Sequence, residues 1–211
     1  MNETVLELNN IEKDYGSAHV LGPLSLEIHS GDMIGIRGEN GSGKSTLLRL
    51  MAGLEKVSSG SIKHTDFMPG ELGYVPQQIA LFPTFTGYQN LRFFAAAIGL
   101  KGKELKQRSR CLLRAVGLEE KAKSKVSTYS GGMQRRLNLA CALLRPPKLL
   151  LADEPTVGAD DRSIELILDI LKELSVNGCA VVLITHHKDE YRKLDCSLYC
   201  LKNGLLIKET E

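Results

Sequence analysis

The sequence predicts an α/β fold in which helices cover a mainly parallel sheet. Short apolar runs with the length of buried strands alternate along the chain with segments whose apolar residues follow helical spacing. This alternation is typical of parallel strands joined by crossover helices. A length of 211 residues is enough to bury a sizeable core. We therefore expect a single domain over residues 1–211, with two additions to the parallel layer.

The first addition is an antiparallel β extension near the N-terminus. Residues 4–30 contain two strand-like runs, and the second alternates Leu24, Leu26 and Ile28 with other residues. Alternation with a period of two is the pattern of a strand with one buried face. Residues 33–36 follow as a short apolar run, which we expect to be a buried strand of the parallel sheet.

The second addition is a helical subdomain over about residues 86–145. This stretch contains no strand pattern and reads as consecutive helices, of which the middle one ends at Gly117. Near the end of the chain, the apolar residues 198–201 and 205–207 flank Asn203 and Gly204. Asn-Gly between apolar runs predicts a β-hairpin.

Residues 38–46 read GENGSGKST and fit the phosphate-binding pattern G-x-x-x-x-G-K-[ST]. Glycines let backbone N–H groups turn toward phosphate oxygens, and the following helix directs its positive dipole end at the same anion. Lys44, which we expect to be surface-directed, supplies a charge for the β- and γ-phosphates, and the Ser45 hydroxyl suits Mg²⁺. The predicted nucleotide contacts are Gly38, Asn40, Gly41, Gly43, Lys44, Ser45 and Thr46. The order of strand, loop and helix favours a P-loop NTPase core of the RecA-like type over a glycine-rich turn that only caps a helix.

A pair of carboxylates ends the apolar run at residues 149–152. Ligands of parallel sheets lie outside the carboxyl ends of the strands, so Asp153 and Glu154 are expected to reach the site of the phosphate loop. Asp153 suits Mg²⁺ coordination, and Glu154 can orient or deprotonate an attacking water. Without the phosphate loop, two solvated acids before a proline would explain this stretch equally well.

Ser130, Gly131 and Gly132 precede a helix and form a second predicted anion-binding corner. Serine is a good N-cap, and the glycines leave backbone N–H groups uncovered. Taken alone, the pattern is also that of an ordinary helix cap. With the two preceding motifs, this ordered set resembles the nucleotide-binding subunits of ATP-binding cassette (ABC) proteins, which carry a signature sequence between their two Walker motifs.

The resemblance implies roles for four further residues. Tyr15 matches the aromatic residue that stacks on adenine, and Asp160 matches the aspartate of the D-loop. Gln77 matches the glutamine that senses Mg²⁺ and the attacking water, with Gln78 as the competing choice. His186 matches the switch histidine that contacts the γ-phosphate, and its neighbour His187 competes for that role.

The chain departs from the family pattern at three positions. Tyr129 and Met133 replace the usual leucine and glutamine of the signature, and Ala159 stands where a leucine is common in the D-loop. Some exporter subunits are similar in having Ser-Gly-Gly-Met followed by basic residues, here Arg135 and Arg136.

The resemblance implies a subunit that binds and hydrolyses ATP, with Mg²⁺, and powers a membrane transporter, with export favoured. Two such domains would close head to tail as a homodimer or pseudo-dimer, with ATP between one phosphate loop and the other signature. Separately encoded transmembrane permease subunits would hold the chain in the cytoplasm, at the inner face of the membrane. The alternative is a soluble ATPase of the same family that acts in macromolecular assembly.

Composition adds little to these functions. The 27 basic and 25 acidic residues give a net charge of +2, so we expect no nucleic-acid partner. The basic run at residues 101–114 is interpreted as the solvated face of a helix. The N-terminus lacks the pattern of a secretory signal, and the longest apolar run, residues 93–100, is too short to span a bilayer. The five cysteines lack zinc-site spacing and are expected to be buried, reduced thiols.

Overall fold

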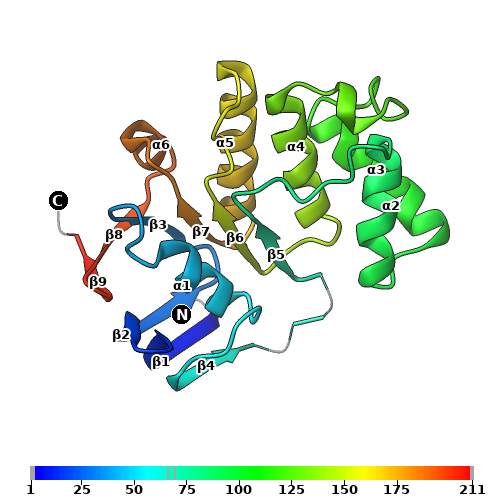
Figure 1. Ribbon diagram of the computed structural model, residues 1–211. Helices are drawn as coiled ribbons and strands as arrows, with labels where there is room; N and C mark the ends of the chain where they lie inside the picture. Colours follow the sequence, from blue (N-terminus) through cyan, green and yellow to red (C-terminus); the bar gives the residue numbers. More distant parts are fainter. Residues whose placement is uncertain (1–2, 66, 69, 210–211) are drawn as a thin grey trace.

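The computed structural model describes residues 3–65, 67–68 and 70–209 and contains two sheets and a group of helices (Figure 1). The strands are β1 (Thr4–Tyr15), β2 (Ala18–His29), β3 (Met33–Arg37), β4 (Ser59–His64), β5 (Leu72–Val75), β6 (Leu149–Asp153), β7 (Ala180–Ile184), β8 (Ser197–Lys202) and β9 (Leu205–Lys208). The helices are α1 (Lys44–Met51), α2 (Gly87–Ala97), α3 (Gly102–Ala115), α4 (Gly131–Ala142), α5 (Asp161–Val176) and α6 (Lys188–Lys193), with a 3₁₀ turn at Val126–Thr128.

The larger sheet has the strand order β5-β6-β7-β3-β8-β9. All its neighbours pair in parallel except β8 and β9, which form the antiparallel hairpin predicted around Asn203 and Gly204. Every residue of β6 and β7 is buried, as expected of a parallel strand with both faces covered. The predicted α/β fold with a mainly parallel sheet is thus confirmed.

The smaller sheet is antiparallel, with the order β2-β1-β4. The prediction of a β extension is confirmed for β1 and β2, whereas β4 carries no signal in the sequence. Five of its six residues are exposed, so it has no apolar alternation to detect. Strand β5 was also not predicted, because it has only four residues and includes Gly73.

Helix α1 lies between the two sheets (Figure 1), and this position explains its composition. Leu47, Leu48, Leu50 and Met51 are all at most 1% exposed and pack in one cluster with residues of β1, β2, β3 and β6. Alternate residues of β6 and β7 point to the opposite face of the sheet, where they pack on α4, α5 and α6. The phosphate loop therefore sits on a helix that is fixed from both sides.

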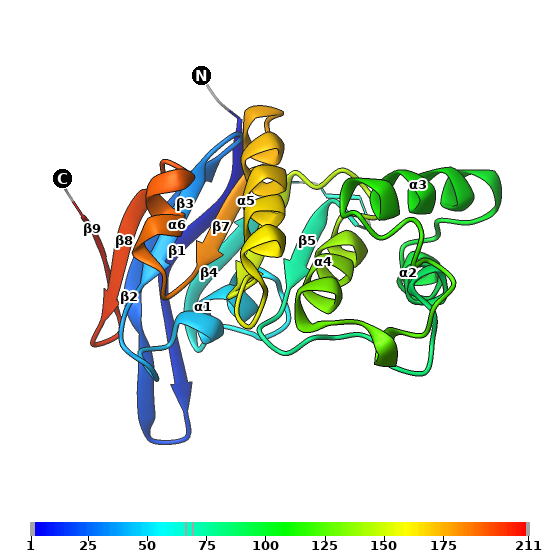
Figure 2. The same ribbon diagram turned by 90° about the horizontal axis from the view of Figure 1, so that it is seen from above.

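Helices α2, α3 and α4 lie together at one side of the larger sheet (Figure 2). Residues 86–145, all described, contain these helices and no strand, as the sequence predicts. Helix α2 begins with a capping box in which Thr86 and Gln89 exchange side-chain and backbone hydrogen bonds. Helix α3 ends at Ala115, and Gly117 follows with a φ of 63°, which agrees with the predicted stop.

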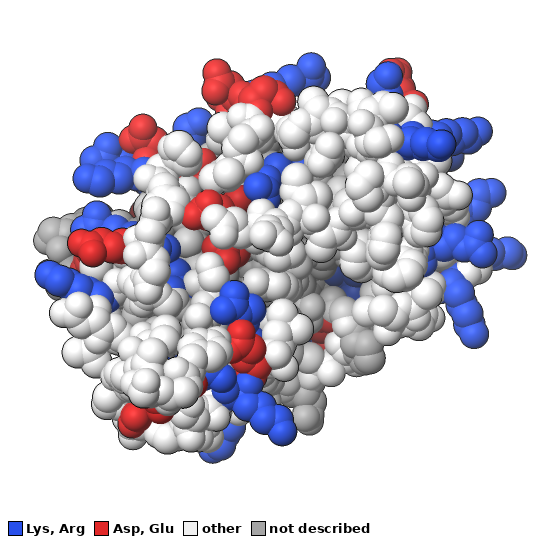
Figure 3. Space-filling model, viewed as in Figure 1, with Lys and Arg blue, Asp and Glu red and all other residues white. Residues whose placement is uncertain are grey.

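The basic run on α3 is a solvated face, as interpreted from the sequence. Lys and Arg side chains gather at the end of the molecule that holds α2 and α3 (Figure 3). Arg108 is the exception, because its guanidinium is half-buried and donates to the carbonyl oxygens of Leu143 and Leu144 at 2.8 and 3.1 Å. Among the described residues, no helix combines the length and apolar character needed to cross a membrane.

All five thiols are free, but the prediction that they are buried is wrong for Cys111, which is exposed on α3. The apolar side of that helix is formed by Leu105, Leu112 and Leu113, and Cys111 lies outside this stripe. Cys179 is buried, at 4% exposure, and the remaining three thiols are partly buried.

We predict that Cys111 reacts first with a thiol-modifying dye near neutral pH. Burial raises the pKa of the Cys179 and Cys196 thiols to about 12 and raises that of Cys141 as well, so little reactive thiolate forms at those positions. Absorbance during labelling of the folded protein should show one fast equivalent. The Cys111→Ser variant should lack the fast phase. A fast phase of the same size in this variant would show that another cysteine reacts first.

Candidate nucleotide site

A cavity of about 590 Å³ opens at the carboxyl edge of the larger sheet and gathers most of the predicted site. Its lining residues are Tyr15, Val20, Asn40, Gly41, Gly43, Lys44, Ser45, Thr46, Gln77, Asp153, Glu154 and His186. Val20 was not predicted, because an isolated apolar residue on a strand gives no motif. Gly38 lies at the base of the phosphate loop, and Ser130, Gly131 and Gly132 are not among the lining residues.

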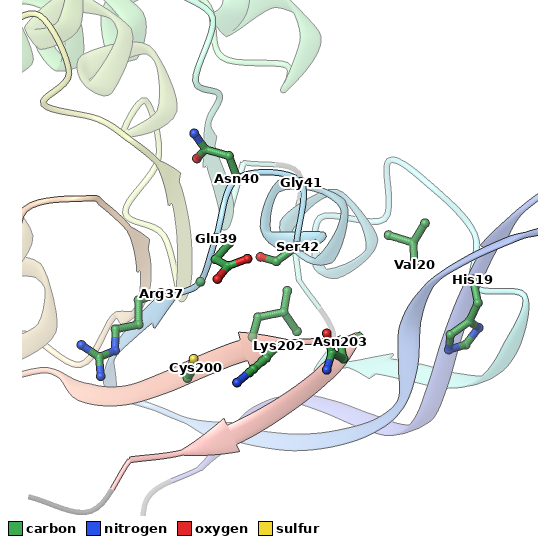
Figure 4. Close-up of a pocket in the computed structure, with 13 residues that line it drawn as sticks. His19, Val20, Arg37, Glu39, Asn40, Gly41, Ser42, Cys200, Lys202 and Asn203 are labelled. Carbon is green, nitrogen blue, oxygen red and sulfur yellow. The ribbon is translucent and has the colours of Figure 1, made fainter.

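A second cavity of about 620 Å³ lies between the phosphate loop and the β8–β9 hairpin (Figure 4). It is lined by Arg37, Gly38, Glu39 and Lys202, among others, and shares Val20, Asn40 and Gly41 with the first. Although it is slightly larger, it contains neither Lys44 nor the paired carboxylates. We therefore place the nucleotide in the first cavity, where these groups converge.

The phosphate loop adopts a conformation that only glycine tolerates at Gly43. This residue caps α1 with a φ of 99°, and a Cβ there would lie 2.8 Å from a methyl carbon of Leu21. The Lys44 ammonium donates to the carbonyl oxygens of Gly38 and Glu39, each at 2.9 Å. Lys44 is only 7% exposed, so the expectation that it is surface-directed is wrong. Its side chain folds back across the loop, and burial lowers the pKa of its ammonium.

Ser45 and Asp153 form a pair of oxygen donors that suits Mg²⁺. Both residues line the cavity, and the Asp153 carboxylate is 2% exposed. Burial raises the pKa of Asp153, and the Ser45 hydroxyl acts in the opposite direction. The described residues contain no cluster of three or more His, Cys, Asp or Glu that could enclose a metal ion. A hydroxyl and one carboxylate are nevertheless sufficient for Mg²⁺, which keeps several waters and binds substrate phosphates.

Glu154 is held in an unusual backbone conformation beside Asp153. Its φ of 48° lies in the left-handed region, where residues other than glycine are uncommon, and this turn brings both adjacent acids to the cavity. One carboxylate oxygen accepts from Gln77 Nε2 at 2.9 Å, and the other lies 2.7 Å from His186 Nε2. Gln77 and His186, rather than their neighbours Gln78 and His187, are thus the residues that contact Glu154.

Tyr15 also lines the cavity, with its ring accessible. Tyr15 is 45% exposed, and its hydroxyl donates a hydrogen bond to the Glu55 carboxylate. The Lys13 ammonium lies 4.8 Å from the ring centroid, which orients the ring through a cation–π contact. A fixed, open aromatic face of this kind can stack on a nucleobase.

Ser130, Gly131 and Gly132 lie at the start of α4, next to the D-loop. Ser130 caps the helix as predicted, with its hydroxyl oxygen accepting from the Met133 N–H at 3.2 Å. A Cβ on Gly132 would lie 2.4 Å from a carboxylate oxygen of Asp160, so glycine is required for this close approach. Ser130 and Gly131 are exposed, and neither lines the cavity of the same chain.

Arg135 is a structural link that sequence reasoning did not identify. Its guanidinium is 8% exposed and donates to the carbonyl oxygens of Gln77 at 2.6 Å and Val157 at 3.0 Å. Arg135 therefore joins the helix of Ser130 to the Gln77 segment and to the D-loop. The sequence marked Arg135 only as a basic residue after Ser-Gly-Gly-Met and did not indicate its partners.

Comparison with known proteins identifies the family. A family model for the ABC transporter matches residues 21–157. The linearmycin resistance ATP-binding protein LnrL of Bacillus subtilis (strain 168) is 38% identical over 211 residues, covering 96% of this chain and 68% of that protein. A Nod factor export ATP-binding protein I of Cupriavidus pinatubonensis (strain JMP 134 / LMG 1197) is 38% identical over 208 residues, covering 95% of this chain and 64% of the relative.

Solved structures agree with this relationship. A dimeric bacterial ABC transporter cassette superposes with a TM-score of 0.86 at 30% identity, over 98% of both chains. A cassette dimer in a post-hydrolysis state, bound to ADP and Pi, superposes with a TM-score of 0.84 at 30% identity over the same share of both chains. The chain belongs to the ABC transporter family and is an ATP-binding cassette that hydrolyses ATP, which confirms the predicted family, fold and activity. It spans 68% and 64% of the length of the two relatives.

The exposed ring of Tyr15 generates a prediction about nucleotide affinity. Tyr15→Ala should weaken ATP binding by about 1–2 kcal/mol, roughly 5- to 30-fold, because a base–aromatic stack is lost. Turnover at saturating ATP should change little. Titration with a fluorescent ATP analogue measures the affinity, and Tyr15→Phe is the matched control, since it removes the hydroxyl bond to Glu55 and keeps the ring. Equal affinity in the alanine variant would exclude Tyr15 from the site.

Proposed function

We propose that this chain is the ATP-hydrolysing motor of a membrane exporter and works with separately encoded permease subunits. The observation that carries this proposal is the convergence of the phosphate loop, Asp153 and Glu154 with Gln77 and His186 in one cavity. The names of two relatives, one for export and one for resistance to a compound, support export. Permease subunits would hold the chain in the cytoplasm, at the inner face of the membrane.

In this proposal, each cavity residue has a separate task in hydrolysis. Lys44 and the N–H groups of the phosphate loop bind the β- and γ-phosphates. Ser45 and Asp153, with Gln77 close by, hold Mg²⁺, which supplies positive charge against the phosphate oxygens. Glu154 orients and deprotonates the attacking water, and His186 is placed to contact the γ-phosphate. The Glu154 carboxylate is held on one side by the hydrogen bond from Gln77 and on the other by the His186 imidazole 2.7 Å away.

The second half of the ATP site is proposed to come from another cassette, in a homodimer or a pseudo-dimer. Ser130, Gly131 and Gly132 form a helix start that does not line the cavity of its own chain. Its uncovered N–H groups and the positive end of the α4 dipole suit a phosphate. Dimeric cassettes of the same fold support this arrangement. Closure around ATP and reopening after hydrolysis would then move the permease.

An aromatic surface close to the Gln77 segment is the proposed contact for the permease. Phe82, Phe85, Phe93 and Phe94 form a cluster with ring centroids 4.5 to 6.4 Å apart. Phe82 is 38% exposed and Phe93 is 50% exposed, which is unusual for such large apolar side chains. An apolar cytoplasmic segment of the permease would cover these rings and transmit motion to the loop that carries Gln77.

The alternative is a soluble ATPase of the same family that acts in macromolecular assembly. It has the same cavity chemistry, so the partner is what separates the two functions. The exposed aromatic cluster and the relatives named for export and resistance favour transport.

We predict that Glu154→Gln binds ATP but hydrolyses it at least about 10²-fold more slowly, because the amide keeps the shape and removes the base. The trapped state should form an ATP-dependent dimer in size-exclusion chromatography and dissociate with ADP. Adding Ser130→Arg to this variant should prevent the dimer, since a bulky cation then occupies the signature corner. Normal hydrolysis by Glu154→Gln would exclude Glu154 as the base, and a dimer that survives Ser130→Arg would exclude the proposed interface.

The aromatic surface provides a test of the transport function. Affinity-tagged protein, isolated with detergent from membranes of its source organism, should co-purify with a protein that contains several membrane spans. Phe82→Asn combined with Phe93→Asn should abolish this co-purification, while ATP binding by the purified chain stays within about twofold, because the rings lie outside the cavity. If the parent and the double variant both co-purify with soluble assembly factors and with no membrane protein, the alternative function would be favoured.

A further inference from the structure

A buried tyrosine hydroxyl lies between the phosphate-loop strand and the segment that precedes His186. Tyr191, on α6, is 4% exposed, and its hydroxyl oxygen accepts from the Thr185 N–H at 3.0 Å. The same oxygen lies 2.9 Å from the carbonyl oxygen of Ile36 and 2.7 Å from that of Thr185. Since the hydroxyl has one proton, these two carbonyls share its donation. Burial raises the pKa of Tyr191 to about 12, so the proton stays on the oxygen at neutral pH.

This hydroxyl continues the sheet beyond the point where strand pairing stops. The parallel pairing of β3 and β7 ends at the partners Ile36 and Ile184. Thr185 is 2% exposed, so its N–H would be a buried donor without a partner if Tyr191 did not accept from it. The residue that follows Thr185 is His186, whose imidazole lies 2.7 Å from Glu154. Tyr191 thus fixes the backbone immediately before the predicted switch histidine.

The remaining contacts of α6 prevent the tyrosine from shifting. The ring lies against Gly35, where a Cβ would be 2.5 Å from Tyr191 Cδ1, so the strand has a space that fits the ring. The neighbouring Glu190 is 4% exposed and accepts from the Thr156 hydroxyl at 2.8 Å. Thr156 lies two residues after Glu154. Helix α6 is therefore tied both to the phosphate-loop strand and to the turn that holds Glu154.

We propose that Tyr191 is a positioning residue for ATP hydrolysis, which fixes the segment of His186 so that the imidazole stays against Glu154. The proposal rests on the roles proposed above for His186 and Glu154. Tyr191 lines neither described cavity and acts through Thr185. Its loss should therefore affect the hydrolytic step more than the binding of ATP.

The test is the Tyr191→Phe variant, which keeps the ring against Gly35 and removes only the oxygen. Its kcat should fall roughly tenfold, while KM for ATP changes less than about twofold, because misplacing a group in the hydrolytic site affects the transition state and not nucleotide binding. Ser175→Ala is the matched control. It removes a 2.8 Å side-chain bond to the Gly31 carbonyl oxygen at the opposite end of β3, so it should lower Tm without lowering kcat.

Nuclear magnetic resonance of the five histidine rings separates positioning from a general loss of stability. In Tyr191→Phe, the signal of His186, assigned by its absence in His186→Ala, should move, while the signals of His19, His29 and His64 stay in place. A parent-like kcat would overturn the proposal, and so would a lower kcat with an unmoved His186 signal. If His186→Ala alone retains the parent kcat, the proposed role of His186 is wrong, and positioning by Tyr191 falls with it. The kcat of His186→Ala therefore distinguishes a wrong role for His186 from a wrong role for Tyr191.

Discussion

The site depends on three neighbouring parallel strands, β6, β7 and β3, that end at one edge of the sheet. Asp153 of β6 and Ile36 of β3 both pair with Ile184 of β7. The three strands therefore end at the same level, and the segments that follow them leave the sheet side by side. Because these segments carry the phosphate loop, Glu154 and His186, a slip of one strand would separate groups that must act together. The interior residues of these strands are apolar for this reason, since their packing on both faces keeps the register.

The charges at this edge compensate one another only partly. Burial lowers the pKa of Lys44 and raises that of Asp153, while their mutual attraction acts in the opposite direction on each. Glu154 meets an amide and an imidazole instead of a lysine or arginine. Both carboxylate oxygens are thereby held in place by a neighbour on either side. A carboxylate held in this way fits the role proposed for Glu154, which is to orient and deprotonate the attacking water.

The sequence was most informative where one residue type is needed for a local reason. Glycines of the phosphate loop, the Ser130 cap and the Asn203-Gly204 turn could be predicted, because backbone conformation or capping limits the choice at these positions. The end of the apolar run at residues 149–152 likewise predicted that Asp153 and Glu154 would reach the phosphate loop. Features that depend on tertiary contacts could not be predicted from the sequence. Exposed β4 has no periodicity, and Lys44 folds back on carbonyl groups that the sequence does not place.

Buried polar links form a second class of features that the sequence did not show. Arg135 and Tyr191 each form hydrogen bonds with backbone groups of segments far away in the chain, and no local sequence pattern predicts such partners. Both links connect segments that carry residues of the proposed site. Separating the Gln77 segment from α4 or from the D-loop would leave the buried Arg135 guanidinium and a carbonyl oxygen without partners, which costs free energy. A fixed connection between the Gln77 segment, the helix of Ser130 and the D-loop is what the proposed coupling between a membrane partner and closure of the nucleotide site would require.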